Sequence, residues 1–165
     1  MAISLRAAEI SDAEAIRTIY NHEVVHTAAT FDLVPRTLDD QVAWLQARSG
    51  AFSAVVATDD TGDVVGFGAL SPYKERAAYR TSVEDSVYVR RDRNGQGIGT
   101  LIVRSLLANA ASSGFHAVFA RINASSDGSI ALHRKCGFQL VGVEREVGRK
   151  FNRWHDVALM QYLVP

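Results

Sequence analysis

Hydrophobic positions along the 165-residue chain recur with two different spacings, and each spacing is typical of one kind of element. Early in the chain, apolar residues recur every three to four positions, which predicts two helices joined by a loop. The first helix is expected to follow Ser11, which forms a capping-box pattern with Glu14. The second is expected to follow Thr37, capped together with Asp40, and to end at Gly50.

The remaining apolar runs are rich in β-branched and aromatic residues and are bounded by turn-forming residues, which predicts strands. In chain order these runs are "ISLRAA", "FSAVVA", "VVGFGAL", "SVEDSVYV", "HAVFARI", "FQLVGVERE" and "HDVALMQYLV". The turn "TDDTGD" joins the second run to the third and predicts an antiparallel hairpin. Two more helices are expected, one from about Thr100 to Ser113 and one over "GSIALHRKC" before Gly137.

The predicted order is β-α-α-β-β-β-α-β-α-β-β. This order indicates an α/β (α+β) fold in which about four helices flank a mixed, mostly antiparallel central sheet. No repeat, low-complexity tract or linker divides the chain, so we expect residues 1–165 to form a single domain.

Composition and charge exclude several classes of function. The chain has 18 Lys and Arg residues against 18 Asp and Glu residues, so no net charge draws it to nucleic acid or to an anionic membrane. No apolar run approaches the roughly 20 residues of a membrane span, and the first residues lack an export pattern. The single cysteine, Cys136, suits a reducing compartment. We therefore expect a cytoplasmic protein that acts on small molecules, without a metal.

The stretch "RNGQGIGT" at residues 93–100 places three glycines where a strand ends and a helix begins. The spacing does not fit a dinucleotide fingerprint, because the sixth place from Gly95 is Thr100, nor a Walker A loop, because no lysine follows Gly99. Backbone N–H groups at a helix N-terminus favour an anion such as a pyrophosphate. The alternative is a turn that is rich in glycine for backbone reasons only.

The segment "VYVRRDRNGQGIGTLIV" resembles the acetyl-CoA-binding segment of the GNAT N-acetyltransferases. Gly97 and Gly99 match the family's pattern, whereas Asn94 stands where the family has Gln or Arg. The predicted order of elements is also that of the GNAT fold. Four segments together resemble the branch that acetylates phosphinothricin, methionine sulfoximine and methionine sulfone: "IYNHEVVHTAATFDLVPRTLDDQVAWL", "LSPYKERAAYRTSVEDSVYV", "INASSDGSIALHRKCGF" and "VGRKFNRWHDVALMQ".

This resemblance implies an enzyme that moves the acetyl group of acetyl-CoA to the α-amine of a small amino acid, and that is a homodimer. It also implies a set of cofactor-binding residues along the strand, the glycine loop and two later positions. They are Val87, Tyr88, Val89, Asn94, Gly95, Gln96, Gly97, Ile98, Gly99, Thr100, Asn123 and Ser129. The strand is expected to pair with the pantetheine arm, and a main-chain N–H near Val87 to bind the thioester oxygen.

The resemblance implies two catalytic side chains. Glu84 interrupts an apolar strand where related enzymes carry their proposed general base, although by spacing alone a surface carboxylate is the simpler interpretation. His133 occupies the place beside the CoA sulfur, although a lone histidine on a short helix is more often structural. Asp85 points to the opposite face from Glu84 and is the weaker candidate. Cys136 has no orienting partner in the pattern and is interpreted as a buried thiol.

For the acceptor, Arg76 is the expected anchor for a carboxylate or tetrahedral oxyanion, assisted by Arg80. Tyr73, Tyr79 and Phe31 are expected to wall the pocket. Other functions stay open, namely acetylation of another small amine or of a protein N-terminus, or a silent acyl-CoA-binding module. A polyamine acceptor is disfavoured, because two arginines would repel it.

Overall fold

The structure, a computed structural model, describes residues 2–165 and contains the helices and strands in the predicted order. The helices are α1 (Ala13–His26), α2 (Leu38–Gln46), α3 (Ile98–Ser112) and α4 (Asp127–Lys135). The strands are β1 (Ser4–Ala7), β2 (Val55–Thr58), β3 (Val64–Pro72), β4 (Ser82–Val89), β5 (Ala117–Asn123), β6 (Gln139–Lys150) and β7 (Arg153–Leu163). Short 3-10 turns lie in the connections, at Ile10–Asp12, Gly50–Phe52, Ala77–Tyr79 and Arg91–Arg93.

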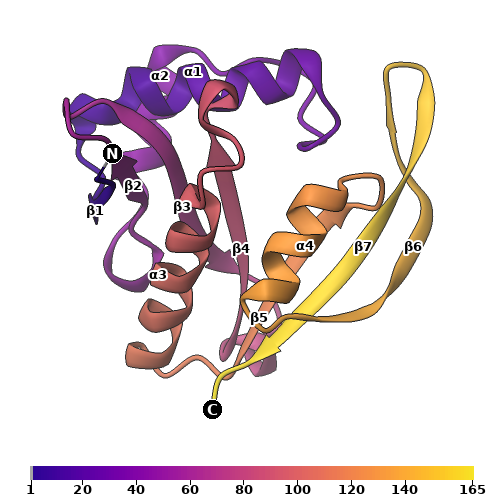
Figure 1. Cartoon of the computed structure of the whole chain (residues 1–165). Coiled ribbons are helices and arrows are strands. Elements are labelled where there is room, and N and C mark those ends of the chain that lie inside the picture. The colour runs from indigo at the N-terminus through magenta and orange to yellow at the C-terminus, as the bar shows by residue number, and fades with distance from the viewer. Residues whose placement is uncertain (1) are drawn as a thin grey trace.

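The strands of the described chain form one open sheet in the order β1-β2-β3-β4-β5-β7-β6. Neighbouring strands are antiparallel except for β4 and β5, so the predicted mixed, mostly antiparallel sheet is confirmed. The parallel pairing joins only residues 82–84 to residues 117–119. Beyond these residues β4 and β5 diverge, and the sheet opens in its middle (Figure 1).

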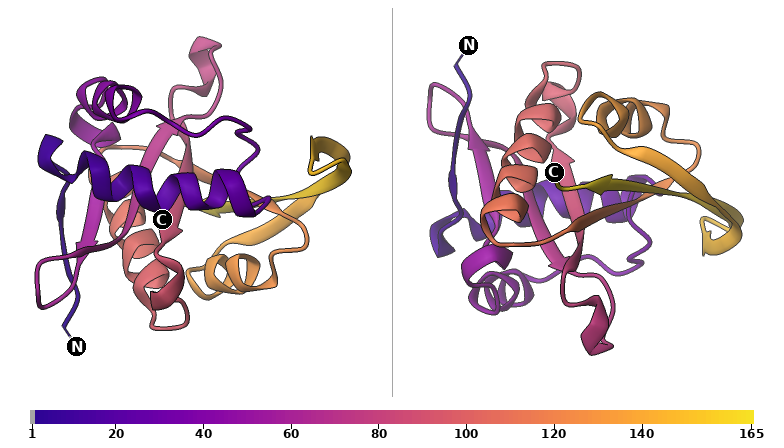
Figure 2. Two further views of the ribbon diagram at one scale, coloured as in Figure 1. Left: turned by 90° about the horizontal axis from the view of Figure 1, so that it is seen from above. Right: turned by 90° about the horizontal axis from the view of Figure 1, so that it is seen from below.

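The helices cover both faces of the sheet, as the views from above and below show (Figure 2). One core lies beneath α1 and α2 and contains Ile16, Tyr20 and Phe67. The other lies beneath α3 and contains Ile102 and Leu106, each with 0% of its surface exposed. Burying one such side chain contributes roughly 1.5–3 kcal/mol. These two cores hold β4 between them and fix which of its side chains face each layer.

The start of the first helix differs from the sequence prediction. Ser11 was expected to cap α1, but it lies inside the turn Ile10–Asp12, and α1 begins at Ala13. Asp12 accepts a hydrogen bond from the backbone N–H of Glu9 at 2.8 Å and pairs with Arg6 of β1 at 2.7 Å. This contact with β1 decides where the chain turns, and the sequence pattern at Ser11 contains no sign of it.

The second helix has the predicted start and an earlier end. The side chain of Thr37 accepts from the backbone N–H of Asp40, and the carboxylate of Asp40 accepts from the N–H of Thr37, so the predicted cap is confirmed. The helix ends at Gln46, whereas Gly50 begins a separate 3-10 turn. The third helix starts two residues before the predicted Thr100, because Gly97 is its N-cap.

The last two strands are longer than predicted and form an arm that extends past the rest of the sheet (Figure 1). Within the arm, Asp156 accepts from the N–H of Glu146 at 2.7 Å, and the guanidinium of Arg149 lies 4.7 Å from the ring centre of Trp154. Trp154 is 57% exposed, and several other apolar side chains of the arm are exposed to a similar degree. The arm therefore presents an apolar surface to solvent in one copy of the chain.

Candidate active site

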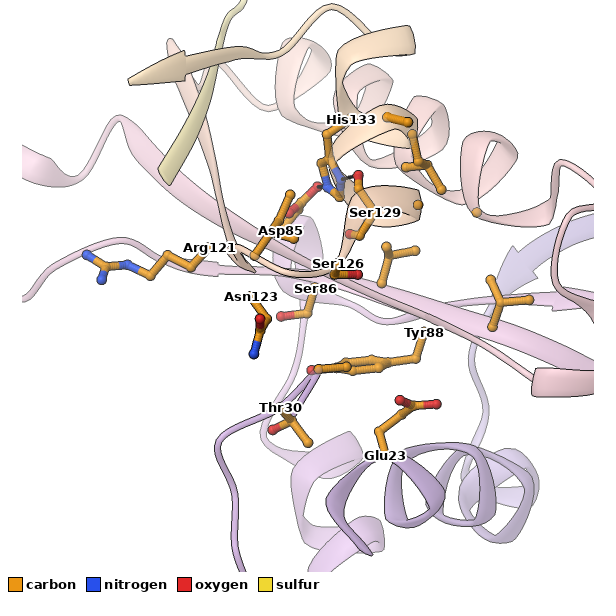
Figure 3. A pocket seen from close by; sticks show the side chains of 18 of the residues that line it. Glu23, Thr30, Asp85, Ser86, Tyr88, Arg121, Asn123, Ser126, Ser129 and His133 are labelled. Carbon is orange, nitrogen blue, oxygen red and sulfur yellow. Dashed lines mark hydrogen bonds and ion pairs between the residues drawn. The ribbon is translucent and has the colours of Figure 1, made fainter. Parts of the chain in front are cut away.

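The main cavity has a volume of about 960 Å³ and lies where β4 and β5 diverge. Its walls come from β4, the glycine loop and the first turn of α3 on one side and from β5 and α4 on the other. The end of α1 and the segment that follows it close the cavity from below in the close view, where Glu23 of α1 and Thr30 of the segment face Tyr88 of β4 (Figure 3). Segments far apart in the sequence thus meet around one space.

The glycine loop forms the end of the cavity at α3. Gly97 is the N-cap residue of α3 and adopts φ 81°, a left-handed conformation that an L side chain rarely adopts. The first backbone N–H groups of a helix have no acceptor within the helix, and here Ile98, Gly99 and Thr100 carry them beside the cavity. This end of the cavity is therefore suited to bind an anion. Of the predicted loop residues 94–100, all but Gln96 line the cavity.

The open edge of β4 forms the middle of the cavity. On its other side β4 is paired with β3 over its full length, from Val83 to Val89. On the cavity side the pairing with β5 ends at Glu84. Backbone groups beyond Glu84, around Val87 and Tyr88, are therefore placed to pair with an extended ligand, as a further strand would.

Glu84 lies at the end of this open edge, where β5 begins to diverge. Its side chain is 29% exposed and makes an ion pair of 3.6 Å with Arg121 of β5, which donates to Glu144 of β6 at 2.8 Å. Burial raises the pKa of Glu84 above its usual value; the charge of Arg121 opposes this, and the carboxylates of Asp85 and Glu144 add to it. A carboxylate with a raised pKa in a cavity is suited to accept a proton near neutral pH.

Asp85 and His133 form a buried pair in the wall formed by β4 and α4 (Figure 3). Nε2 of His133 lies 3.0 Å from Oδ2 of Asp85, and Nδ1 lies 2.8 Å from the backbone oxygen of Ser129. From the sequence, Asp85 was ranked below Glu84 because its side chain points to the opposite face of the strand. The side chain of Asp85 does point to that face, and α4 packs there and places His133 in contact with it.

Asn123, predicted to bind the cofactor arm, is tied into the protein at both ends of its amide. Its nitrogen donates to the backbone oxygen of Ala28 at 3.2 Å, and its oxygen accepts from the N–H and hydroxyl of Ser125. Ser129, the other predicted residue, lines the cavity, with its carbonyl directed to His133. A direct contact of either side chain with a cofactor stays a prediction.

The predicted acceptor residues fall into two places. Phe31 lines the cavity and packs so closely on Gly148 of the arm that any side chain at Gly148 would overlap its ring. Arg76 and Tyr79 lie in a separate surface depression on the loop between β3 and β4, which projects from the sheet (Figure 2). Arg80 follows Tyr79 on the same loop and does not line the main cavity of the described chain.

Tyr73 connects that loop to the region of Glu84. Its ring stacks on Phe119 of β5, with 4.2 Å between ring centres, and Phe119 is the register partner of Glu84. Sequence reasoning missed Phe119 and also Arg121, two residues further along. A charged residue inside the apolar run "HAVFARI" is the signal that could have singled out Arg121, as it did Glu84.

The segment after α1 is held in place by buried polar contacts. Lys150 of the arm is 4% exposed and donates to the backbone oxygen of Thr30 at 2.8 Å; burial lowers its pKa. Glu23 is equally buried and accepts from Nε of Arg91 at 2.7 Å. The hydroxyl of Tyr20 contacts Thr30 at 3.0 Å. These bonds connect α1 and the segment after it to the turn Arg91–Arg93, just before the glycine loop, and to the arm.

Within residues 2–165, no helix is both long enough and apolar enough to cross a membrane. The same residues contain no cluster of three or more His, Cys, Asp or Glu side chains placed to hold a metal ion.

Comparison with known proteins agrees with this geometry. Residues 5–159 match the family model described as an acetyltransferase (GNAT) domain. An L-methionine sulfoximine/L-methionine sulfone acetyltransferase from Pseudomonas paraeruginosa is 36% identical over 98% of this chain and 94% of its own length. A phosphinothricin N-acetyltransferase from Streptomyces coelicolor is 38% identical over 94% of this chain and 93% of its own length.

A solved phosphinothricin acetyltransferase of the GNAT superfamily from Sinorhizobium meliloti, in complex with acetyl-CoA, superposes with a TM-score of 0.95 at 34% identity. The match covers 99% of this chain and 89% of that one. The chain belongs to the GNAT acetyltransferase family, and the resemblance drawn from its four segments is confirmed.

Proposed function

We propose that this protein transfers the acetyl group of acetyl-CoA to the α-amine of a small amino acid, with methionine sulfoximine, methionine sulfone and phosphinothricin as the foremost acceptors. One observation carries the proposal: a continuous cavity joins the free N–H groups at the start of α3 to the half-buried carboxylate of Glu84. The names of the relatives give the class of acceptor.

Acetyl-CoA fits the cavity in an extended form. Its pyrophosphate would accept hydrogen bonds from the N–H groups of residues 98–100, where the dipole of α3 favours negative charge. Its pantetheine arm would pair with the open edge of β4 around Val87 and Val89, which directs the thioester toward Glu84. A main-chain N–H near Val87 would then donate to the thioester oxygen as negative charge develops there.

Glu84 acts as the general base. An amino acid arrives as an ammonium, which must lose a proton before its nitrogen can attack the thioester carbon. Glu84 accepts that proton through a water, and its raised pKa suits this task. The new N–C bond forms and the C–S bond breaks. CoA leaves as a thiolate. Of the two protons that the amine loses, one balances the proton taken up by the thiolate and the other passes to solvent, which leaves Glu84 ionised again.

The acceptor would lie in the region between Phe31, Glu84 and Arg121. The guanidinium of Arg121 supplies a positive charge beside the base, and we propose that it helps to bind the acceptor's carboxylate. On the projecting loop, Arg76 and Arg80 are further proposed anchors of the acceptor, and Tyr73 and Tyr79 are proposed to form a wall of its pocket. We also propose a homodimer, because the arm exposes apolar side chains that a second copy would cover.

The test is release of CoA from acetyl-CoA by the purified full chain, with three tetrahedral amino-acid analogues, the common amino acids, spermidine and a peptide with a free N-terminus as acceptors. We expect selective turnover of the tetrahedral analogues. If only the peptide were acetylated, the acceptor would be a protein N-terminus instead of a small amino acid. Tight CoA binding without turnover of any acceptor would indicate a silent binding module.

The same assay tests Glu84. Glu84→Gln keeps the size of the side chain but cannot accept the proton, so kcat should fall by about 10²-fold or more, with CoA affinity within about twofold of wild type. Glu14→Gln, an exposed carboxylate on α1, is the control and should change neither quantity. An unchanged kcat in Glu84→Gln would remove Glu84 from the base role.

A further inference from the structure

The buried pair of Asp85 and His133 lines the cavity on the face of β4 opposite Glu84. Both side chains are only 3% exposed, although each carries an ionisable group. Burying such groups is costly unless they neutralise or pair with one another. The contacts of the pair show which of these arrangements applies.

The contacts define how many protons the pair holds. The backbone oxygen of Ser129 can only accept a hydrogen bond, so Nδ1 of His133, at 2.8 Å from it, must carry a proton. On the other side of the ring, Nε2 faces Oδ2 of Asp85 at 3.0 Å. An unprotonated Nε2 and an ionised carboxylate are both acceptors and cannot bond to each other. A second proton therefore lies between Nε2 and Oδ2.

The position of this second proton does not change the charge of the pair. If it is on Nε2, an imidazolium faces a carboxylate; if it is on Oδ2, a neutral imidazole faces a carboxylic acid. Both arrangements have zero net charge, which suits a site from which water is largely excluded. Burial alone would lower the pKa of His133, but the hydrogen bond and the charge of Asp85 outweigh it and raise that pKa.

Other charged and titratable groups near the pair do not supply this proton. On β4, Glu84 is the neighbour of Asp85 and points to the opposite face of the sheet. Directly after α4, the Cys136 thiol has its pKa raised mainly by burial, with Arg104 of α3 opposing that effect. The ring of Phe138 stands edge-on to His133 with centres 4.9 Å apart. The second proton therefore belongs to Asp85 and His133.

We infer that Asp85 is a positioning residue that keeps a second proton on the Asp85–His133 pair, and that this pair supplies the proton taken up by the leaving CoA thiolate. The inference rests on the proposed function, because it needs a thiolate in the cavity. As the C–S bond breaks, the sulfur takes the bridging proton and the pair is left with one negative charge. One of the two protons lost by the ammonium then refills the pair, and the other leaves to solvent.

The first test observes the pair without any turnover. Nitrogen NMR of the histidine ring, together with carbon NMR of the Asp85 carboxyl group, distinguishes a pair that holds one proton from a pair that holds two, wherever the second proton lies. We expect Nδ1 of His133 to stay protonated and Nε2 to keep a shared proton to a pH above the usual histidine range. In Asp85→Asn the amide can donate to Nε2 without adding an ionisable group, so the ring should be neutral with its proton on Nδ1 alone. An unprotonated Nδ1 in wild type would overturn the inference.

The second test is kinetic. Asp85→Asn keeps a hydrogen-bonding partner for His133 but not the second proton, so kcat should fall by about 10²-fold while KM for acetyl-CoA stays within about twofold. In wild type, kcat should decline at high pH as the pair loses its proton, and this alkaline decline should disappear in Asp85→Asn. If Asp85→Asn kept the kcat and the pH dependence of wild type, the pair would be only a structural contact and the inference would be overturned.

These two tests separate the inference from the proposed function. If wild type turns over no acceptor but the spectra of the ring and the carboxyl group show two protons on the pair, the proposed function fails while the assignment of two protons stands. If turnover is normal and these spectra show only one proton on the pair, only the inference fails. Asp85→Ala serves as a stability control, because it leaves His133 buried without its partner and should lower the melting temperature.

Discussion

At the scale of single residues, this site depends on carboxylates that meet different partners. Glu84 and Asp85 are adjacent in sequence but point to opposite faces of β4, since side chains alternate along a strand. Glu84 meets Arg121 and is partly open to solvent, whereas Asp85 meets His133 and is buried. The first carboxylate is thus suited to gain a proton during a reaction, and the second to share one beforehand.

The charge of Arg121 should set the pH at which Glu84 becomes a base. Removing it in Arg121→Gln takes away an effect that lowers the pKa of Glu84, so that pKa should rise further. Because a base must be deprotonated, the acid limb of kcat/KM should move to higher pH. Weaker binding of the acceptor's carboxylate would lower kcat/KM equally at all pH values, so the position of the limb is the readout. An ion pair exposed to this degree contributes roughly 0.2–1 kcal/mol, so activity on that limb should fall by up to about fivefold.

Glu144→Gln is the control that should act in the opposite direction to Arg121→Gln, and it is measured by the same pH profile of kcat/KM. The carboxylate of Glu144 raises the pKa of Glu84, so its removal should move the acid limb to lower pH. If both variants move the limb in the same direction, the electrostatic account of Glu84 is wrong.

At the scale of elements, the first turn of α3 decides where an anion can bind. Gly97 allows the left-handed turn from which α3 starts, so that residues 98–100 of its first turn line the cavity. A side chain at Gly97 would meet no atom within 4 Å, so a substitution there acts through backbone strain alone. That strain costs roughly 1–2 kcal/mol for an L residue.

Gly97→Ala should therefore lower both stability and CoA affinity. The matched control is Gly114→Ala at the other end of α3, which has φ 80° and equally open surroundings but does not line the cavity. Both variants should lose about 1–2 kcal/mol of unfolding free energy in denaturant titrations. Only Gly97→Ala should also weaken CoA binding by calorimetry, and equal CoA affinity in the two variants would contradict the anion site.

At the scale of the whole molecule, the arm formed by β6 and β7 connects the site to the outer surface. Lys150 and Gly148 fasten it to the segment after α1, which closes the cavity. Its outer residues include Val141 and Val143, exposed to 56% and 44%. Apolar side chains gathered on an edge strand favour contact with another chain.

Val141→Asp should therefore convert the proposed homodimer into monomers. A charge placed in an apolar interface must lose its water without gaining a partner, which disfavours association. Sedimentation should give the mass of two chains for wild type and of one for the variant. Val25→Asp on the exposed face of α1, itself 48% exposed, is the control and should leave the mass unchanged. A monomeric wild type would contradict the proposal.

The sequence by itself determined the order of the elements, the place of the glycine loop before α3 and the family. These depend on signals carried by neighbouring residues: alternation along strands, the cap at Thr37 and Asp40, and the glycines before α3. Such signals are local, because backbone conformation responds mainly to nearby side chains. Where the prediction was wrong, as at Ser11, a side-chain contact between Asp12 and Arg6 of the preceding strand accompanies the local turn, and no periodic pattern encodes such a contact.

Only the tertiary structure decided which side chains meet. Asp85 and His133 are separated by 48 positions, and Glu84 reaches Arg121 only because β5 returns beside β4 before diverging. The same topology puts the loop of Arg76 outside the main cavity and brings Phe31 under the arm. A pattern along the chain shows that a charge interrupts an apolar strand, but its partner and its protonation state depend on how the strands and helices pack.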